Sequence, residues 1–202
     1  NLESIFPRRS PPVTTSPPTP HPQPHSSAQS SGIGRFYLGC AVWAFKGWVG
    51  SFYPNGSRPA NFLKLYGDRL NTVEGNTTFY SVPDESTILR WRDIMPPGFQ
   101  FCPKLPRTVS HQGLLMPRFS EALAFLDRVT PLGDRLGPLF LQLPPSYGPD
   151  RLSDLEAFLT EWPTKTAPLG VEVRHPNWFQ SPNPRHLDRL LARRGVSRIL
   201  LD

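Results

Sequence analysis

The sequence predicts an α/β fold, namely a TIM-barrel-like (β/α) parallel barrel that is incomplete and follows a disordered tail. From Arg35 onward, short apolar runs alternate with helical patterns, which is typical of right-handed βαβ units and a parallel sheet. Four of the segments place polar residues on one parity of the expected strand, namely residues 73–76, 99–104, 139–143 and 170–176. Because the strands of an open doubly wound sheet are apolar on both faces, this alternation favours a barrel with a polar inner face.

The first 34 residues differ in composition from the rest of the chain. Residues 1–34 contain eight of the 26 prolines and many serines and threonines, and they offer little that could form a core. We therefore predict a disordered Pro/Ser-rich tail at residues 1–34 and a partial barrel domain at residues 35–202. The tail segment Pro17–Pro20 could dock on an aromatic groove, but its composition favours a plain linker or an upstream extension.

Only about six of the eight βα units of a standard barrel can be found. An unclosed barrel would leave backbone edges on its first and last strands, so we expect the sequence to be a fragment that lacks roughly two βα units. The six expected strands are Phe36–Val42, Thr72–Gly75, Phe99–Lys104, Pro138–Leu143, Gly170–Arg174 and Arg198–Leu201.

Amphipathic patterns between these strands predict the helices. Helix starts are expected at Asp84, Ser120 and Asn183, because polar capping residues or prolines lie at each of these places. Gly195 is expected to end the last helix. Apolar residues recur at helical spacing in residues 62–70, 152–162 and 187–191.

Bulk properties narrow the class of protein. The net charge of +6 favours anionic partners such as phosphate, carboxylate or nucleic acid, although it also fits ordinary solubility. Cys40 and Cys102 both lie in apolar runs, which argues against a disulfide framework and predicts a cytoplasmic location. The sequence has no apolar stretch of membrane-spanning length and no signal-peptide pattern. Cofactor fingerprints and metal-ligand spacings are also absent, so neither a cofactor nor a metal is expected.

Polar residues follow several of the expected strands, where a barrel carries its functional site. We take Glu74, Glu172 and His175 as catalytic candidates, because a positioned carboxylate or imidazole can act as a general acid or base. A purely structural network of Glu74, Lys104, Glu172 and Arg174 remains an alternative. The expected substrate-binding residues are Trp43, Asn76, Lys104, His111, Gln142, Arg174 and Asp202.

Aromatic residues follow the first expected strand. Trp43 and Trp48 could form a stacking wall for a sugar or a base, or they could simply pack in the core.

Several of these segments together resemble the YecE-like family, also known as domain of unknown function 72. The resemblance covers about residues 36–202 and implies a TIM-barrel-like fold with a pocket at the strand ends, but no settled reaction. It also implies truncation at the C-terminus, because the family continues beyond the sixth strand. The matching segments are Gly39–Trp43 with Trp48 and Phe52–Pro54, Val73–Tyr80, Phe101–Arg107 with His111, Gln142–Pro145, and Val171–Pro176 with Trp178.

Three functional hypotheses follow. The leading one is an enzyme that binds a small anionic or polyhydroxylated, sugar-like ligand in the polar pocket. The second is a protein that binds or processes nucleic acid, because positive charge and aromatic residues occur together. The third is a non-catalytic barrel. The sequence leaves the oligomeric state open.

Overall fold

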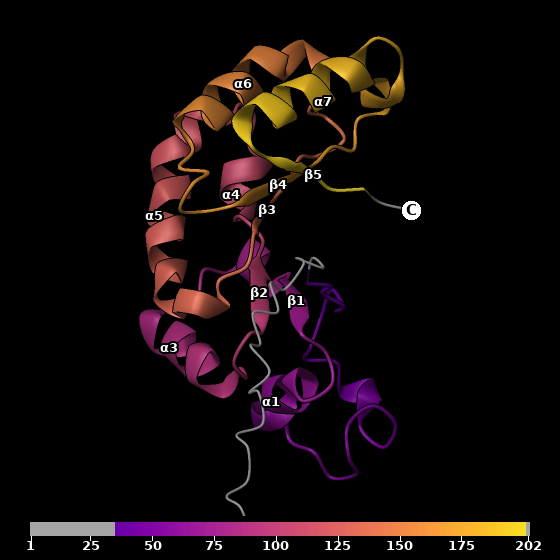
Figure 1. The fold of residues 1–202 in the computed structure, drawn as a ribbon, viewed down its shortest axis with the longest axis vertical. Helices are drawn as coiled ribbons and strands as arrows, with labels where there is room; N and C mark the ends of the chain where they lie inside the picture. The colour runs from indigo at the N-terminus through magenta and orange to yellow at the C-terminus, as the bar shows by residue number, and fades with distance from the viewer. Residues whose placement is uncertain (1–34, 201–202) are drawn as a thin grey trace, which may run out of the picture. The chain divides into compact units, whose positions relative to one another are not determined.

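The computed structural model describes residues 35–200 of the 202-residue chain (Figure 1). The predicted disordered tail at residues 1–34 and the candidate residue Asp202 lie outside this range. Residues 36–202 form one unit, of which the structure describes residues 36–200.

Five parallel strands run through this unit in the order of the sequence. They form two small sheets, one of two strands and one of three. The expected parallel α/β architecture is therefore confirmed. The strands are β1 (Thr72–Gly75) paired with β2 (Gln100–Pro103), and β3 (Leu139–Gln142) paired with β4 (Leu169–Glu172), which also pairs with β5 (Ser197–Arg198).

Backbone hydrogen bonds connect the two sheets between β2 and β3. The Gly137 amide donates to the Phe101 carbonyl at 2.8 Å, and the Leu105 amide donates to the Phe140 carbonyl at 2.9 Å. Isolated parallel bridges accompany these bonds. The carboxyl ends of β1 to β4 consequently point the same way and can contribute to one site.

The first expected strand, Phe36–Val42, is wrong as a regular strand, although the segment does run beside β1. Its carbonyls at Leu38 and Cys40 accept backbone hydrogen bonds at 3.3 and 3.1 Å, respectively. Its amides bond to side chains instead of to β1: the Leu38 amide donates to Asn71 Oδ1 at 2.7 Å, and the Cys40 amide donates to the Tyr66 hydroxyl. A regular ladder uses the amides of a strand as well as its carbonyls, and side chains take two of the amides here, so no regular strand forms.

Most expected helix boundaries are confirmed. Asp84 caps α3 by accepting a hydrogen bond from the Thr87 amide at 2.7 Å, and Gly195 ends α7 with a left-handed φ of +65°. Helix α5 begins one residue before the expected Ser120. The α-helices are α1 (Phe62–Gly67), α2 (Thr77–Tyr80), α3 (Glu85–Ile94), α4 (Arg107–Ser110), α5 (Phe119–Val129), α6 (Leu152–Glu161) and α7 (Asn183–Arg194).

Short 3₁₀ helices fill the connections. They are η1 (Lys46–Trp48), η2 (Pro59–Asn61), η3 (Met116–Arg118), η4 (Thr130–Arg135), η5 (Pro149–Arg151) and η6 (Pro176–Phe179). None of the helices within residues 35–200 is both long enough and apolar enough to cross a bilayer.

The strands separate an apolar layer from a polar face, as their alternation predicts. Helices α3, α5, α6 and α7 lie along one side of the strands (Figure 1). On that side, Phe101 of β2 stacks on Trp91 of α3 with ring centroids 5.0 Å apart. Buried residues at the same parity, such as Val73, Leu141 and Val171, belong to the same core. The alternate positions carry the polar side chains of the candidate site.

Candidate functional site

A buried ion pair joins the ends of β1 and β2. Lys104 follows β2, and its Nζ lies 2.6 Å from Oε1 of Glu74 in β1. The Lys104 side chain is only 6% exposed, whereas that of Glu74 is 27% exposed. The ammonium also lies 4.8 Å from the ring centroid of Phe140 and 5.8 Å from that of Phe79. Glu74 is therefore the carboxylate that compensates a nearly dehydrated cation.

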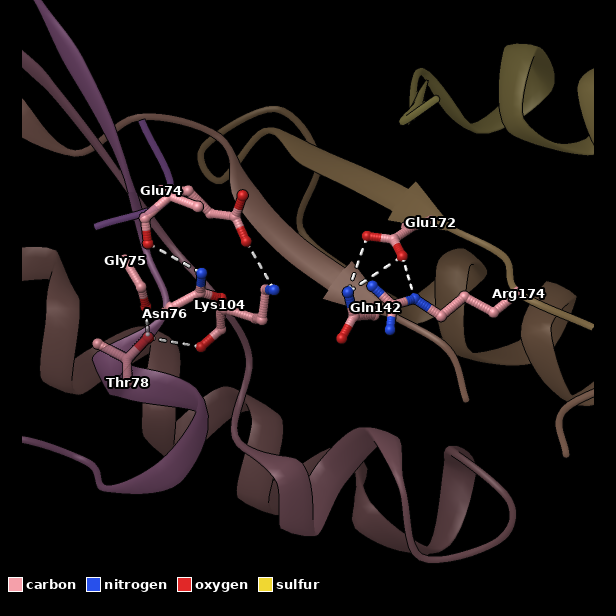
Figure 2. Close-up of polar contacts among 9 residues, drawn as sticks. Glu74, Gly75, Asn76, Thr78, Lys104, Gln142, Glu172 and Arg174 are labelled. Carbon is pink, nitrogen blue, oxygen red and sulfur yellow. Dashed lines mark hydrogen bonds and ion pairs between the residues drawn. The ribbon is translucent and has the colours of Figure 1, made fainter. Parts of the chain in front are cut away.

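A second cluster surrounds Glu172 at the end of β4 (Figure 2). Glu172 is 2% exposed, and Nε2 of Gln142 donates to both of its carboxylate oxygens at 3.0 and 2.9 Å. Residues Gln142 and Glu172 are partners in the β3–β4 register, which explains their contact. The Nε of Arg174 also donates to Glu172. This carboxylate is thus desolvated yet held in one orientation.

The two clusters are separate. Within residues 35–200, no hydrogen bond or ion pair links the Glu74–Lys104 pair to the Glu172–Arg174 pair, and Figure 2 shows them as two groups. The four-residue network considered from the sequence is therefore two local pairs. Each carboxylate carries its own cation, so each pair can change without breaking the other.

Helix α2 supports the first pair through a residue that the sequence does not predict as part of a site. The hydroxyl of Thr78 lies 2.8 Å from the Gly75 carbonyl and 2.7 Å from the Lys104 carbonyl, and it is fully buried. One hydroxyl thereby ties together the ends of β1 and β2. The side chain of Asn76, a predicted binding residue, donates to the Ala41 carbonyl at 2.9 Å. No sequence motif distinguishes Thr78 from an ordinary helical threonine.

His111 packs against Phe79, whose ring centroid lies 5.8 Å from Nζ of Lys104. Its Nδ1 is 2.8 Å from Oγ of Ser110, and its ring meets the ring of Phe79 edge-on at 5.0 Å. Burial lowers the pKa of His111, and the positive charges of Arg107, Arg174 and Lys104 lower it further, while Glu172 opposes them. A neutral imidazole can both donate and accept a proton, which is the property needed of an acid–base group.

We expect His111 to titrate below its ordinary pKa of 6.5 in the folded chain. Because the unfolded chain then binds this proton more readily than the folded chain, the free energy of unfolding should fall as the pH drops below about 6.5 and be fully retained above it. Proton–carbon NMR of the histidine rings measures the pKa, and urea unfolding at pH 7.5 and 5.5 measures the stability.

His111→Gln should reduce this acid sensitivity. The matched control is His186→Gln, on the exposed side of α7, which should leave the contribution of His111 unchanged. A His111 pKa at or above 6.5 would contradict the described environment.

The remaining predicted residues lie elsewhere. Trp43 is 7% exposed and packs edge-on against Trp91 and Phe101, at 5.4 and 5.5 Å between ring centroids. It also lines a small cavity of about 190 Å³. His175 caps η6, where its Nδ1 accepts a hydrogen bond from the Asn177 amide at 3.1 Å. Trp48, the other candidate for a stacking wall, lies among neighbouring aromatic rings.

Residues 35–200 contain no group of three or more His, Cys, Asp or Glu side chains that could hold a metal ion. The side chains of the described site offer two carboxylates, two partnered cations and an imidazole.

Comparison with known proteins identifies the family of the chain. The family model described as "Protein of unknown function DUF72" matches residues 37–202. The chain belongs to the DUF72 family. The family expected from the sequence motifs is thus confirmed.

Two curated DUF72 relatives are similar along most of the chain. The UPF0759 protein YecE of Escherichia coli K12 is 39% identical over 167 residues, and that of E. coli O157:H7 is 38% identical over 167 residues. Each alignment covers 82% of this chain but 58% of the relative. The chain thus spans less than two thirds of the length of the curated relatives that it matches.

Two crystal structures of a DUF72 family protein from Enterococcus faecalis V583 have the same fold. Their TM-scores are 0.61 and 0.66, at 21% and 20% sequence identity. The alignments cover 82% of this chain and 62% and 60% of those chains. At this identity the likeness concerns the fold, so the roles of the site residues rest on the geometry above.

Proposed function

We propose that this DUF72 protein is an enzyme that binds a small anionic or polyhydroxylated, sugar-like substrate at the carboxyl ends of its strands. We further propose that the strands belong to a TIM-barrel-like fold. Parallel strands in sequence order, helices along one side and polar residues on the other support that architecture. In such folds the functional site lies at the carboxyl ends of the strands.

One observation carries the proposal, which is the burial of Glu172. A carboxylate that is 2% exposed is costly unless it is paired and hydrogen-bonded, and Gln142 and Arg174 satisfy that need. The Arg174 side chain is itself 40% exposed, and within residues 35–200 its Nε is the only guanidinium atom for which a side-chain hydrogen bond is found. The remaining guanidinium donors can therefore hold an anionic group next to an oriented carboxylate.

The roles follow from these contacts. Glu172 would accept a proton, or a hydrogen bond donated by a substrate hydroxyl, and Gln142 would fix the orientation of its carboxylate. Arg174, whose side chain is 40% exposed, would contact an anionic group of the substrate, while Lys104 would stay paired with Glu74. His111, whose lowered pKa favours the neutral imidazole, would relay a proton. The reaction class supported by this set is general acid–base chemistry on an anionic or hydroxylated small molecule.

The test is whether ligand binding depends on Glu172. We expect the chain purified from cells to carry, or to be thermally stabilised by, a small anionic or polyhydroxylated metabolite. Glu172→Gln keeps the size of the side chain but removes the charge, so binding should weaken at least about tenfold, the scale of one charge-assisted hydrogen bond. Native mass spectrometry detects a bound metabolite, and thermal shift with a metabolite extract compares the stabilisation of the unaltered chain with that of Glu172→Gln.

The matched control is Glu161→Gln at the exposed end of α6, which should bind like the unaltered chain. Equal binding by the Glu172 variant would overturn the proposal, as would the absence of any bound or stabilising metabolite. Nucleic acid that co-purifies and dissociates with salt would instead favour the hypothesis of nucleic-acid binding.

A further inference from the structure

A cavity of about 680 Å³ lies beside helices α2 and α4. Its volume is within the range of small-molecule sites, which spans roughly 300–1,000 Å³. Neither ion pair lines it, but Phe79 and His111 do, and the ring centroid of Phe79 lies 5.8 Å from Nζ of Lys104. The cavity therefore adjoins the candidate site. The residues that matter here are Phe79, Tyr80, Arg107, His111, Gln112 and Glu121.

Arg107 is the notable charge in this cavity. Within residues 35–200, none of the hydrogen bonds or ion pairs involves its guanidinium, and the residue is exposed. The carboxylate in the same cavity, Glu121, is already engaged by the hydroxyl of Thr108 and, at 3.9 Å, by Arg118. The cavity thus presents a cation that its own carboxylate does not neutralise.

The charged residues around His111 also leave a net positive charge. Lys104 and Arg174 each have a carboxylate partner, whereas Arg107 has none among the described residues. The local sum is therefore one positive charge with His111 neutral. An anion that enters the cavity would meet this charge and would also favour protonation of His111.

We propose that this cavity is a phosphate subsite, so that the ligand is a small phosphorylated polyhydroxylated molecule such as a sugar phosphate. This inference rests on the proposed function and narrows its substrate class. The planar fork of an arginine binds two oxygens of a phosphate at once.

Phosphate fits the cavity better than carboxylate does. A phosphate group has a third terminal oxygen, which needs a donor from another direction. The imidazole of His111 can supply one. The amide of Gln112 can supply another, because its Oε1 already accepts from Arg118 at 3.1 Å and leaves the NH₂ group available. The Phe79 and Tyr80 rings, 5.0 Å apart, supply an apolar wall.

The experiment compares inorganic phosphate, glucose 6-phosphate and glucose in nitrogen-15 NMR titrations at constant ionic strength. We expect both phosphate probes to shift the amides of residues 107–112, and glucose 6-phosphate to bind more tightly than glucose. Arg107→Gln should weaken the binding of inorganic phosphate and of glucose 6-phosphate at least tenfold. Arg107→Lys keeps the charge but loses the planar fork, so its affinity for phosphate should lie between that of the unaltered chain and that of Arg107→Gln.

Arg189→Gln provides the control, since it removes the same charge from the exposed face of α7 and should bind phosphate normally. Unchanged phosphate binding by Arg107→Gln would overturn the inference, as would shifts spread evenly over basic surfaces. Binding of a single-stranded oligonucleotide that depends on Arg107, without binding of glucose 6-phosphate, would also overturn it.

The two proposals can fail separately. If phosphate does not bind near Arg107 while a metabolite still binds in a manner that depends on Glu172, only the phosphate subsite is wrong. If phosphate binds near Arg107 while no binding depends on Glu172, the proposed function is wrong and the assignment of the cavity to phosphate stands.

Discussion

Glu74→Leu should destabilise the chain by about 3 kcal/mol, because breaking a buried pair leaves an uncompensated charge. The charge in question is the ammonium of Lys104, whose side chain is 6% exposed. The faces of Phe79 and Phe140 would remain as its partners, and they replace only part of the lost attraction. Denaturant unfolding at neutral pH measures the difference.

The opposite substitution should be much milder. Lys104→Met keeps an unbranched side chain against the two aromatic rings and removes the buried cation. It leaves the carboxylate of Glu74, which is 27% exposed and can turn toward water. We expect a loss below about 1.5 kcal/mol, the range of volume-conserving core substitutions.

The double variant Glu74→Leu with Lys104→Met should return to within about 1 kcal/mol of the original stability, because apolar replacement of a buried ion pair is often neutral. Equal losses of unfolding free energy in Glu74→Leu and Lys104→Met would contradict the difference in burial between the two side chains. Ligand binding by the double variant then shows whether the Glu74–Lys104 pair is structural or functional. Retained binding indicates a structural pair, and lost binding in a stable chain indicates a functional one.

The polar face could be predicted because strand periodicity is a local property. Side chains alternate with a period of two, so the positions of Glu74, Gln142 and Glu172 follow from short stretches of sequence. The contact between Gln142 and Glu172 needs one further fact, the parallel register of β3 and β4. The sequence pattern of alternating strands and helices already implied parallel neighbours.

Other features depend on contacts between distant residues and could not be predicted. The segment Phe36–Val42 has a strand-like composition, yet the side chains of Asn71 and Tyr66 take two of its amides. The role of Thr78 depends on where α2 places its hydroxyl relative to two carbonyls. Likewise, that Arg107 has no ion-pair partner within residues 35–200 is recognisable only once its surroundings are known.

A buried tryptophan connects the loops that follow β3 and β4. Trp178 in η6 is fully buried, and its Nε1 donates to the Tyr147 carbonyl at 2.8 Å. The hydroxyl of Tyr147 in turn donates to Asp154 of α6 at 2.7 Å. These contacts fix the loop after Gln142 against the loop after Glu172.

Trp178→Ala should therefore cost about 3–5 kcal/mol in the free energy of unfolding, the usual penalty for removing a buried tryptophan ring. Trp178→Phe keeps most of the ring but loses the hydrogen bond, so we expect a smaller loss of about 1–2 kcal/mol. Denaturant unfolding measures both. The control is Phe179→Ala at the next residue, which is 59% exposed and should cost less than about 1 kcal/mol.

The comparison also tests how the site is held. If the loops position Gln142 and Glu172, Trp178→Phe should weaken ligand binding even under conditions where the chain remains fully folded. If the strands alone position them, the variant should lose stability but bind normally, because the β3–β4 register would still bring the two side chains together. Equal stability of Trp178→Ala and Phe179→Ala would contradict the packing of η6 itself.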